Sequence, residues 1–83
     1  MTLLYFAWLR EQIGHEREEV ALPPDVRTVS ALIEWLRGRG DHYATALEDL
    51  SVVRVAVNQE FAEPDQAIAD GDEVALFPPV TGG

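Results

Sequence analysis

The chain closes with Pro78-Pro79-Val80-Thr81-Gly82-Gly83, and its last two glycines are the residues best suited to chemistry. A terminal Gly-Gly has no side chains to pack, so it contributes little to a core. The proline pair fixes φ and favours extension, which projects the terminal carboxylate away from the domain. At about 3.4 Å per residue, the segment from Pro78 onward reaches about 20 Å, enough to enter another protein's active site. We therefore expect a domain over residues 1–77 and a reactive tail over residues 78–83, with a frayed terminus as the alternative.

Side chains suited to catalysis or metal binding are scarce elsewhere. The chain has no cysteine, which excludes disulfides, thiolate metal sites and cysteine nucleophiles. His15 and His42 have no second ligand at a useful spacing, so we expect them to be surface or capping residues. The acidic residues near Asp70 lack the pattern of a calcium loop and indicate turn chemistry. We expect no metal site and no catalytic machinery belonging to this chain.

Composition limits the class of protein and its partners. With 83 residues, 47% of them hydrophobic, the chain is expected to form one small globular domain. The formal net charge of −9 opposes binding to nucleic acid or to an anionic membrane and favours a basic protein partner. All six basic residues are arginines, so no side-chain amine is available for isopeptide attachment. Neither a membrane span nor a signal peptide is evident, and we expect a cytoplasmic protein.

Two strands are expected in the first part of the chain. The apolar, aromatic run Leu3–Leu9 predicts a central strand with both faces at least partly covered. Residues 16–22 predict the second strand of a hairpin, with Val20 and Leu22 pointing inward. Three acidic residues of this segment are expected to form a solvated face: Glu16, Glu18 and Glu19.

Helical patterns follow. Thr28 is a candidate N-cap for a helix whose apolar residues recur with helical spacing, and Gly38 and Gly40 are expected to end it. Its predicted inner stripe is Val29, Leu32, Ile33 and Leu36. Residues 41–50 predict a second, shorter helix. Its expected inner side consists of Tyr43, Leu47 and Leu50.

The remaining residues predict strands. Alternation over residues 52–57 places Val53, Val55 and Val57 on one face and Arg54 on the other. A turn at residues 58–59 leads to a short strand near residues 60–62, and Ile68 is expected to anchor a connection to the core. After a turn at residues 70–71, a last strand over residues 73–77 faces Val74 and Leu76 inward. The order predicts an α+β fold, a mixed sheet with one main helix and a short second helix. Parallel pairing of the first and last strands would make it a ubiquitin-like β-grasp.

Three phenylalanines stand apart from this core pattern. Phe6 and Phe77 are adjacent to inward-facing residues of their strands, so they are expected on the opposite face, and Phe61 belongs to a short exposed strand. Gathered beside the tail, they would form an apolar docking surface. The alternative is that some of them are core residues under a loop.

Three segments carry a resemblance to a known family. They are Phe6-Ala7-x-x-Arg10-Glu11, Val57-Asn58-Gln59 and the block from Asp70 to Gly83, which is the most specific. Over its whole length the chain resembles the small subunit of molybdopterin synthase. The resemblance implies a β-grasp sulfur carrier that binds no cofactor of its own.

The resemblance also implies a reaction sequence and partners. Gly83 would be adenylated, with ATP, by an E1-like adenylyltransferase and converted to a thiocarboxylate. The tail with Gly82 would then enter the large subunit, which holds the active site, and donate sulfur to cyclic pyranopterin monophosphate to form molybdopterin. The implied partner-binding residues are Phe6, Phe61, Phe77 and Arg10. The implied assembly is a hetero-oligomer, namely a heterotetramer.

The residues fit such chemistry, and other functions remain open. A C-terminal carboxylate is ionised at neutral pH and is a poor electrophile, so it needs activation before sulfur can attack it. Glycines would let the backbone pass a narrow channel. One alternative is a sulfur carrier for thiazole synthesis or tRNA thiolation, and another is a ubiquitin-like protein modifier. A plain interaction module, which would tolerate loss of the last two glycines, is the third.

Overall fold

The computed structural model describes residues 1–79, so the predictions for Gly82 and Gly83 lie outside the described residues. Nine elements follow one another along the chain. They are β1 (Thr2–Tyr5), α1 (Trp8–Ile13), β2 (Arg17–Glu19), α2 (Val29–Arg37), α3 (Asp41–Ala46), the 3₁₀ turn η1 (Leu50–Val52), β3 (Arg54–Val57), β4 (Glu60–Phe61) and β5 (Glu73–Phe77). In residues 1–79 no helix has both the length and the apolar character needed to cross a membrane.

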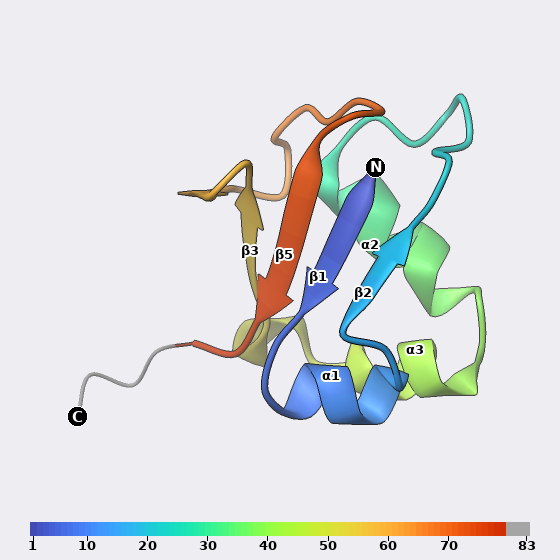
Figure 1. The fold of residues 1–83 in the computed structure, drawn as a ribbon, viewed down its shortest axis with the longest axis vertical. Helices are drawn as coiled ribbons and strands as arrows, with labels where there is room; N and C mark the ends of the chain where they lie inside the picture. Colours follow the sequence, from blue (N-terminus) through green and yellow to red (C-terminus); the bar gives the residue numbers. More distant parts are fainter. Residues whose placement is uncertain (80–83) are drawn as a thin grey trace.

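The strands form one mixed sheet in the order β2-β1-β5-β3-β4. The central strands β1 and β5 are parallel, with Leu3 opposite Val74, and the other neighbouring pairs are antiparallel. In Figure 1, α2 lies behind the sheet, while α1 and α3 lie at the end toward which β1 and β5 run. The parallel first and last strands, with a main helix across one face, confirm the predicted ubiquitin-like β-grasp.

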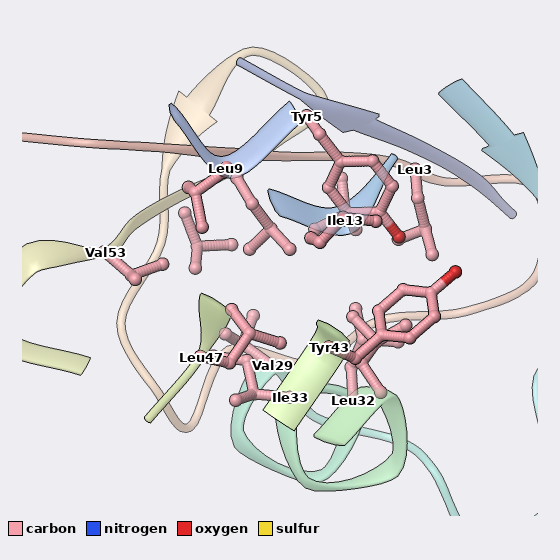
Figure 2. Close-up of a cluster of buried hydrophobic side chains, with 14 of the residues drawn as sticks. Leu3, Tyr5, Leu9, Ile13, Val29, Leu32, Ile33, Tyr43, Leu47 and Val53 are labelled. Atoms are coloured by element: carbon pink, nitrogen blue, oxygen red, sulfur yellow. The ribbon is translucent and has the colours of Figure 1, made fainter. Parts of the chain in front are cut away.

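The helix α2 supplies one side of the core. The Thr28 hydroxyl accepts a hydrogen bond from the Ala31 backbone N–H, 3.2 Å away, so the predicted N-cap is confirmed. All four residues of the predicted apolar stripe are buried: Val29, Leu32, Ile33 and Leu36. Figure 2 shows Leu32 and Ile33 below the side chains of Leu3 and Leu9, with which they share one cluster. Burial of this stripe, at about 25 cal/mol per Å² of apolar surface, holds the helix on the sheet.

The strands predicted in the second half of the chain are present, but β3 begins at Arg54 and not at Val52, which belongs to η1. Val53, Val55 and Val57 are buried while Arg54 is exposed, and Val74 and Leu76 are buried in β5. Ile68 is buried, as expected for an anchor. Asn58 and Gln59 have φ angles of 51° and 70°, which is the geometry of a tight hairpin turn between β3 and β4.

The first strand is shorter than predicted. It ends at Tyr5, and the chain turns at Ala7 into the helix α1, so the prediction of a strand through Leu9 is wrong. Leu9 and Ile13, four residues apart on one face of α1, are both buried, and this burial stabilises the helix. Gly14, with a φ of 89°, closes α1 by donating its N–H to the Arg10 carbonyl.

The predictions of a strand over residues 16–22 and of Leu50 on the inner side of the second helix were wrong in part. Regular β2 pairing ends at Glu19, although the Val20 backbone still exchanges hydrogen bonds with Met1 at 2.8 and 2.9 Å. Leu50 is exposed, because the helix α3 ends at Ala46 and Leu50 belongs to the separate turn η1. By contrast, Tyr43 and Leu47 are buried as predicted.

Glu18 is not part of a solvated face, because the two-residue repeat of a strand puts it on the same side as Val20 and Leu22. Its carboxylate accepts hydrogen bonds from the Tyr5 hydroxyl at 2.7 Å and the Tyr43 hydroxyl at 2.6 Å. The two phenol rings converge in Figure 2. Burial opposes the charged carboxylate, but the hydrogen bonds from Tyr43, Tyr5 and Arg39 outweigh it and lower the pKa of Glu18. The Glu18 cluster, defined as Glu18, Tyr5, Tyr43 and Arg39, therefore ties β1 and β2 to the helical layer.

Candidate docking face

Two aromatic side chains lie together on the face of the sheet away from α2. The register places Phe77 opposite Arg54 and Phe61 opposite Ala56, while the neighbouring pair of Leu76 and Val55 is buried in the core. Because successive side chains alternate between faces, Phe61 and Phe77 share the outer face. Their ring centroids are 5.9 Å apart with an interplanar angle of 41°, within the range of favourable aromatic contacts.

Phe6 lies at the same end of the sheet. Its backbone N–H donates a hydrogen bond to the Leu76 carbonyl, 3.1 Å away, so the residue follows β1 alongside the end of β5. Phe6 is 48% exposed and Phe61 is 81% exposed, whereas Phe77 is half-buried. The structure thus brings all three phenylalanines to the end of β5 from which the tail leaves. We call Phe6, Phe61 and Phe77 the aromatic patch, and its role in partner binding stays a prediction.

Arg10 lies on α1, the helix that follows β1 at this end of the sheet (Figure 1). It is exposed, and within residues 1–79 its guanidinium makes no hydrogen bond or ion pair. Its backbone carbonyl is used in closing α1 at Gly14. The side chain is therefore available to a partner, and the partner-binding role predicted for it remains to be tested.

The root of the tail is held firmly. β5 has hydrogen-bonded neighbours on both sides, β1 and β3, and Phe77, Pro78 and Pro79 are all half-buried. A strand paired on both sides opens less readily than an edge strand. The chain therefore leaves the domain from a fixed position beside the aromatic patch.

Histidine and acidic side chains form no further site in the described part of the chain. Residues 1–79 contain no group of three or more His, Asp or Glu side chains placed to hold a metal ion. His15 and His42 are both exposed, and the His42 ring lies 4.5 Å from that of Tyr43. Asp70 lies in the turn before β5, as predicted. Its carboxylate also accepts a hydrogen bond from the distant Leu22 backbone N–H, 3.1 Å away.

Sequence reasoning missed an apolar groove beside the aromatic patch. The groove has a volume of about 740 Å³ and runs between α2, η1, β3 and the segment after β4. Its lining includes Ala31, Ile33, Leu50 and Pro64, together with Phe61 and Phe77 of the patch. No local pattern signals it, because the helical spacing of residues 41–50 suggested that Leu50 was covered.

The strand order and the helix that crosses one face of the sheet define a ubiquitin-like β-grasp protein. The chain belongs to the ThiS family, whose model matches residues 3–83. It is 47% identical to the molybdopterin synthase sulfur carrier subunit of Escherichia coli over 83 residues, covering 100% of this chain and 99% of the relative. The human molybdopterin synthase sulfur carrier subunit is 33% identical, covering 100% of this chain and 93% of that protein.

Solved structures show the same fold. SAMP1 from Haloferax volcanii superposes with a TM-score of 0.75 and 35% identity, covering 100% of this chain and 98% of that one. Subunit 1 of the molybdopterin-converting factor of Helicobacter pylori, solved as a complex with subunit 2, superposes with a TM-score of 0.64, covering 99% of this chain and 96% of the matched one. At 23% identity this second likeness bears on the fold alone.

Proposed function

We propose that this chain is the sulfur-carrier subunit of a molybdopterin synthase. The observation that supports this most is the 47% identity to a named carrier over nearly the full length of both chains. An alignment of that length includes the C-terminal block as well as the positions of Phe6, Phe61 and Phe77. The β-grasp fold is consistent with this function but does not establish it, because one fold serves many functions.

The proposed chemistry takes place at the carboxylate of Gly83. A carboxylate oxygen attacks the α-phosphorus of ATP on an E1-like adenylyltransferase, and pyrophosphate leaves. Sulfide-level sulfur, as hydrosulfide, then attacks the acyl carbon, AMP leaves, and a thiocarboxylate results. The chain has neither lysine nor cysteine, so no side-chain amine or thiol of its own competes for the activated carbonyl. In the active site of the large subunit the sulfur is then donated to cyclic pyranopterin monophosphate, the C–S bond to Gly83 breaks, and water supplies the oxygen that restores the Gly83 carboxylate.

The aromatic patch supports a docking role in this proposal. Apolar aromatic side chains left in water at one end of a sheet are typical of protein interfaces. Phe6, Phe61 and Phe77 would position the domain on its partners, with Arg10 as a further contact, while the Gly82-Gly83 end enters the active site. The assembly would be a hetero-oligomer, a heterotetramer with the large subunit, in the cytoplasm.

The experiment that tests this proposal measures the mass of the protein and the formation of molybdopterin. Incubated with ATP, a sulfur donor and the cognate adenylating enzyme, the protein should gain the mass of one sulfur in place of one oxygen at Gly83. Only the thiocarboxylated form should yield molybdopterin with the large subunit and the pterin precursor. Deleting Gly83 should abolish both steps with the fold retained, and Gly82→Ala should slow them because its methyl group obstructs a narrow channel. Molybdopterin synthesis by the truncated protein at the normal rate would refute the proposal.

A protein modifier is a second candidate. Its support is the likeness to solved small archaeal modifier protein 1 chains, one of them 30% identical with a TM-score of 0.68. In that role Gly83 would be joined to lysines of other proteins. Because this chain has no lysine, it cannot extend a polymer through its own side chains. Mass spectrometry of high-mass conjugates should detect this function. A branch point on a side chain of this protein would contradict the statement that the chain cannot extend a polymer through its own side chains.

A further inference from the structure

The groove beside the aromatic patch is lined by the helical layer as well as by the sheet. Its walls come from the first turns of α2, except the core residue Leu32, from Leu50 of η1, and from Phe61 to Pro64 at the end of β4 and beyond. Its volume of about 740 Å³ lies within the roughly 300–1,000 Å³ of ligand-binding clefts, so it can accept a few side chains.

The groove exists because β4 is short. It pairs only with Ala56 and Val57, so the first half of β3 has no regular strand partner on that edge. Around this edge the lining passes from Phe77 and Arg54 of the outer face to Val53 and Val55 of the core face. The groove is therefore continuous with the aromatic patch, and Phe61 and Phe77 belong to both.

Charge defines the kind of segment that fits. Glu34 on α2 and Glu63 after β4 are exposed acidic residues of the lining, and the whole chain has a net charge of −9. Glu34 already contacts Arg37 at 2.9 Å, whereas Glu63 has no ion pair within residues 1–79. Among the described residues the lining has one cation, Arg54, which donates to the Ser51 carbonyl at 3.3 Å. An arginine or lysine of a partner would thus be attracted to Glu63.

We propose that this groove is a second docking site for the large subunit, in addition to the aromatic patch. The occupant is a segment of that subunit with a branched aliphatic or aromatic side chain against Leu50 and Ala31 and a basic residue facing Glu63. This inference rests on the proposed function. A carrier that docks through the patch alone could rotate about it, whereas a second contact around the β3 edge holds the tail in one direction.

The turn η1 offers a matched pair of variants. Leu50 and Val52 are exposed to similar extents, 42% and 39%, but only Leu50 lines the groove. Leu50→Asp should weaken binding to the purified large subunit about tenfold or more, and Val52→Asp should leave it unchanged. Because both side chains are exposed, both variants should unfold close to the wild-type temperature. Calorimetric titration beside thermal unfolding measures the two quantities.

A second pair tests the charge. Glu63→Arg should weaken binding, and Asp25→Arg, an equal charge change at an exposed turn residue outside the groove, should not. Equal effects of both members of either pair, or no effect of Leu50→Asp, would overturn the groove proposal. Self-association of the wild type that Leu50→Asp abolishes, with unchanged partner binding, would assign the groove to a second copy instead. Failure of the wild type to bind the large subunit would refute the proposed function itself.

Discussion

Replacing Phe61 by alanine separates docking from folding more clearly than any other change in the aromatic patch. The residue is 81% exposed, so only about a fifth of it is covered in the folded domain. Complete burial of a phenylalanine contributes about 1.5–3 kcal/mol, and the covered fraction therefore contributes roughly 0.5 kcal/mol. Its ring contact with Phe77 adds about 0.5 kcal/mol or more. The expected cost is about 1 kcal/mol, which lowers the melting temperature by about 4–8 °C in a domain of this size.

The affinity of Phe61→Ala for the large subunit should fall by more than the stability of the free domain. A buried aromatic residue at the centre of an interface commonly costs about 2 kcal/mol or more on truncation, which raises Kd about thirtyfold. Isothermal titration of the large subunit into Phe61→Ala, beside calorimetric unfolding of the free variant, gives both values. Val52→Ala, an exposed apolar residue outside the patch and the groove, is the control and should bind normally. An unchanged Kd for Phe61→Ala would refute the docking role of the patch.

Three further predictions concern stability. Because the pKa of Glu18 is lowered in the fold, its ionised carboxylate contributes to the free energy of unfolding above the ordinary pKa of 4.5, and this contribution is lost as the pH falls through the lower folded value. Glu18→Gln should remove that pH-dependent loss in acid titrations followed by circular dichroism. Burial and the hydrogen bond to Glu18 raise the pKa of Tyr43 to about 12, so stability should decline as the pH rises above 10.0, and less so in Tyr43→Phe. Thr28→Ala should cost about 1 kcal/mol in urea unfolding and Thr28→Ser much less, since serine keeps the capping oxygen.

The elements with strong local signals were predictable. Thr28 and the apolar stripe of α2 define a helix start and one buried face, and these two signals agree. The hairpin at Asn58-Gln59 and the alternation around Val55 likewise have their causes within a few residues. In each case the residues that decide the conformation are neighbours in the sequence.

The helix α1 was missed because its causes are not local. Ala7, at its N-cap, makes no side-chain hydrogen bond, and its φ is 55°, so no capping residue announces the helix. The apolar run before it continues the pattern of β1. The spacing of Leu9 and Ile13 with Gly14 behind them was the available signal, but only packing against the core decides in favour of a helix.

The candidate site was predictable in its residues and not in its extent. Alternation predicted that Phe77 lies on the outer face of the sheet, because its neighbour Leu76 faces the core, and the structure puts Phe61 beside Phe77. The groove depends on where β4 stops pairing with β3, and on Leu50 lying outside α3. Those boundaries are set by contacts between distant segments, which a single sequence does not reveal.

The parallel pairing of β1 and β5 also determines how the domain responds to force. Met1 precedes the start of β1 and Pro78 follows the end of β5, so the two points lie at opposite ends of adjacent strands (Figure 1). Tension between them loads the hydrogen bonds of the pair along the strands, in shear, and all of these bonds must yield together. An antiparallel pair pulled from one end would instead open one bond at a time. Force applied between the start of β1 and the tail should therefore meet more resistance than force that opens a strand pair from one end.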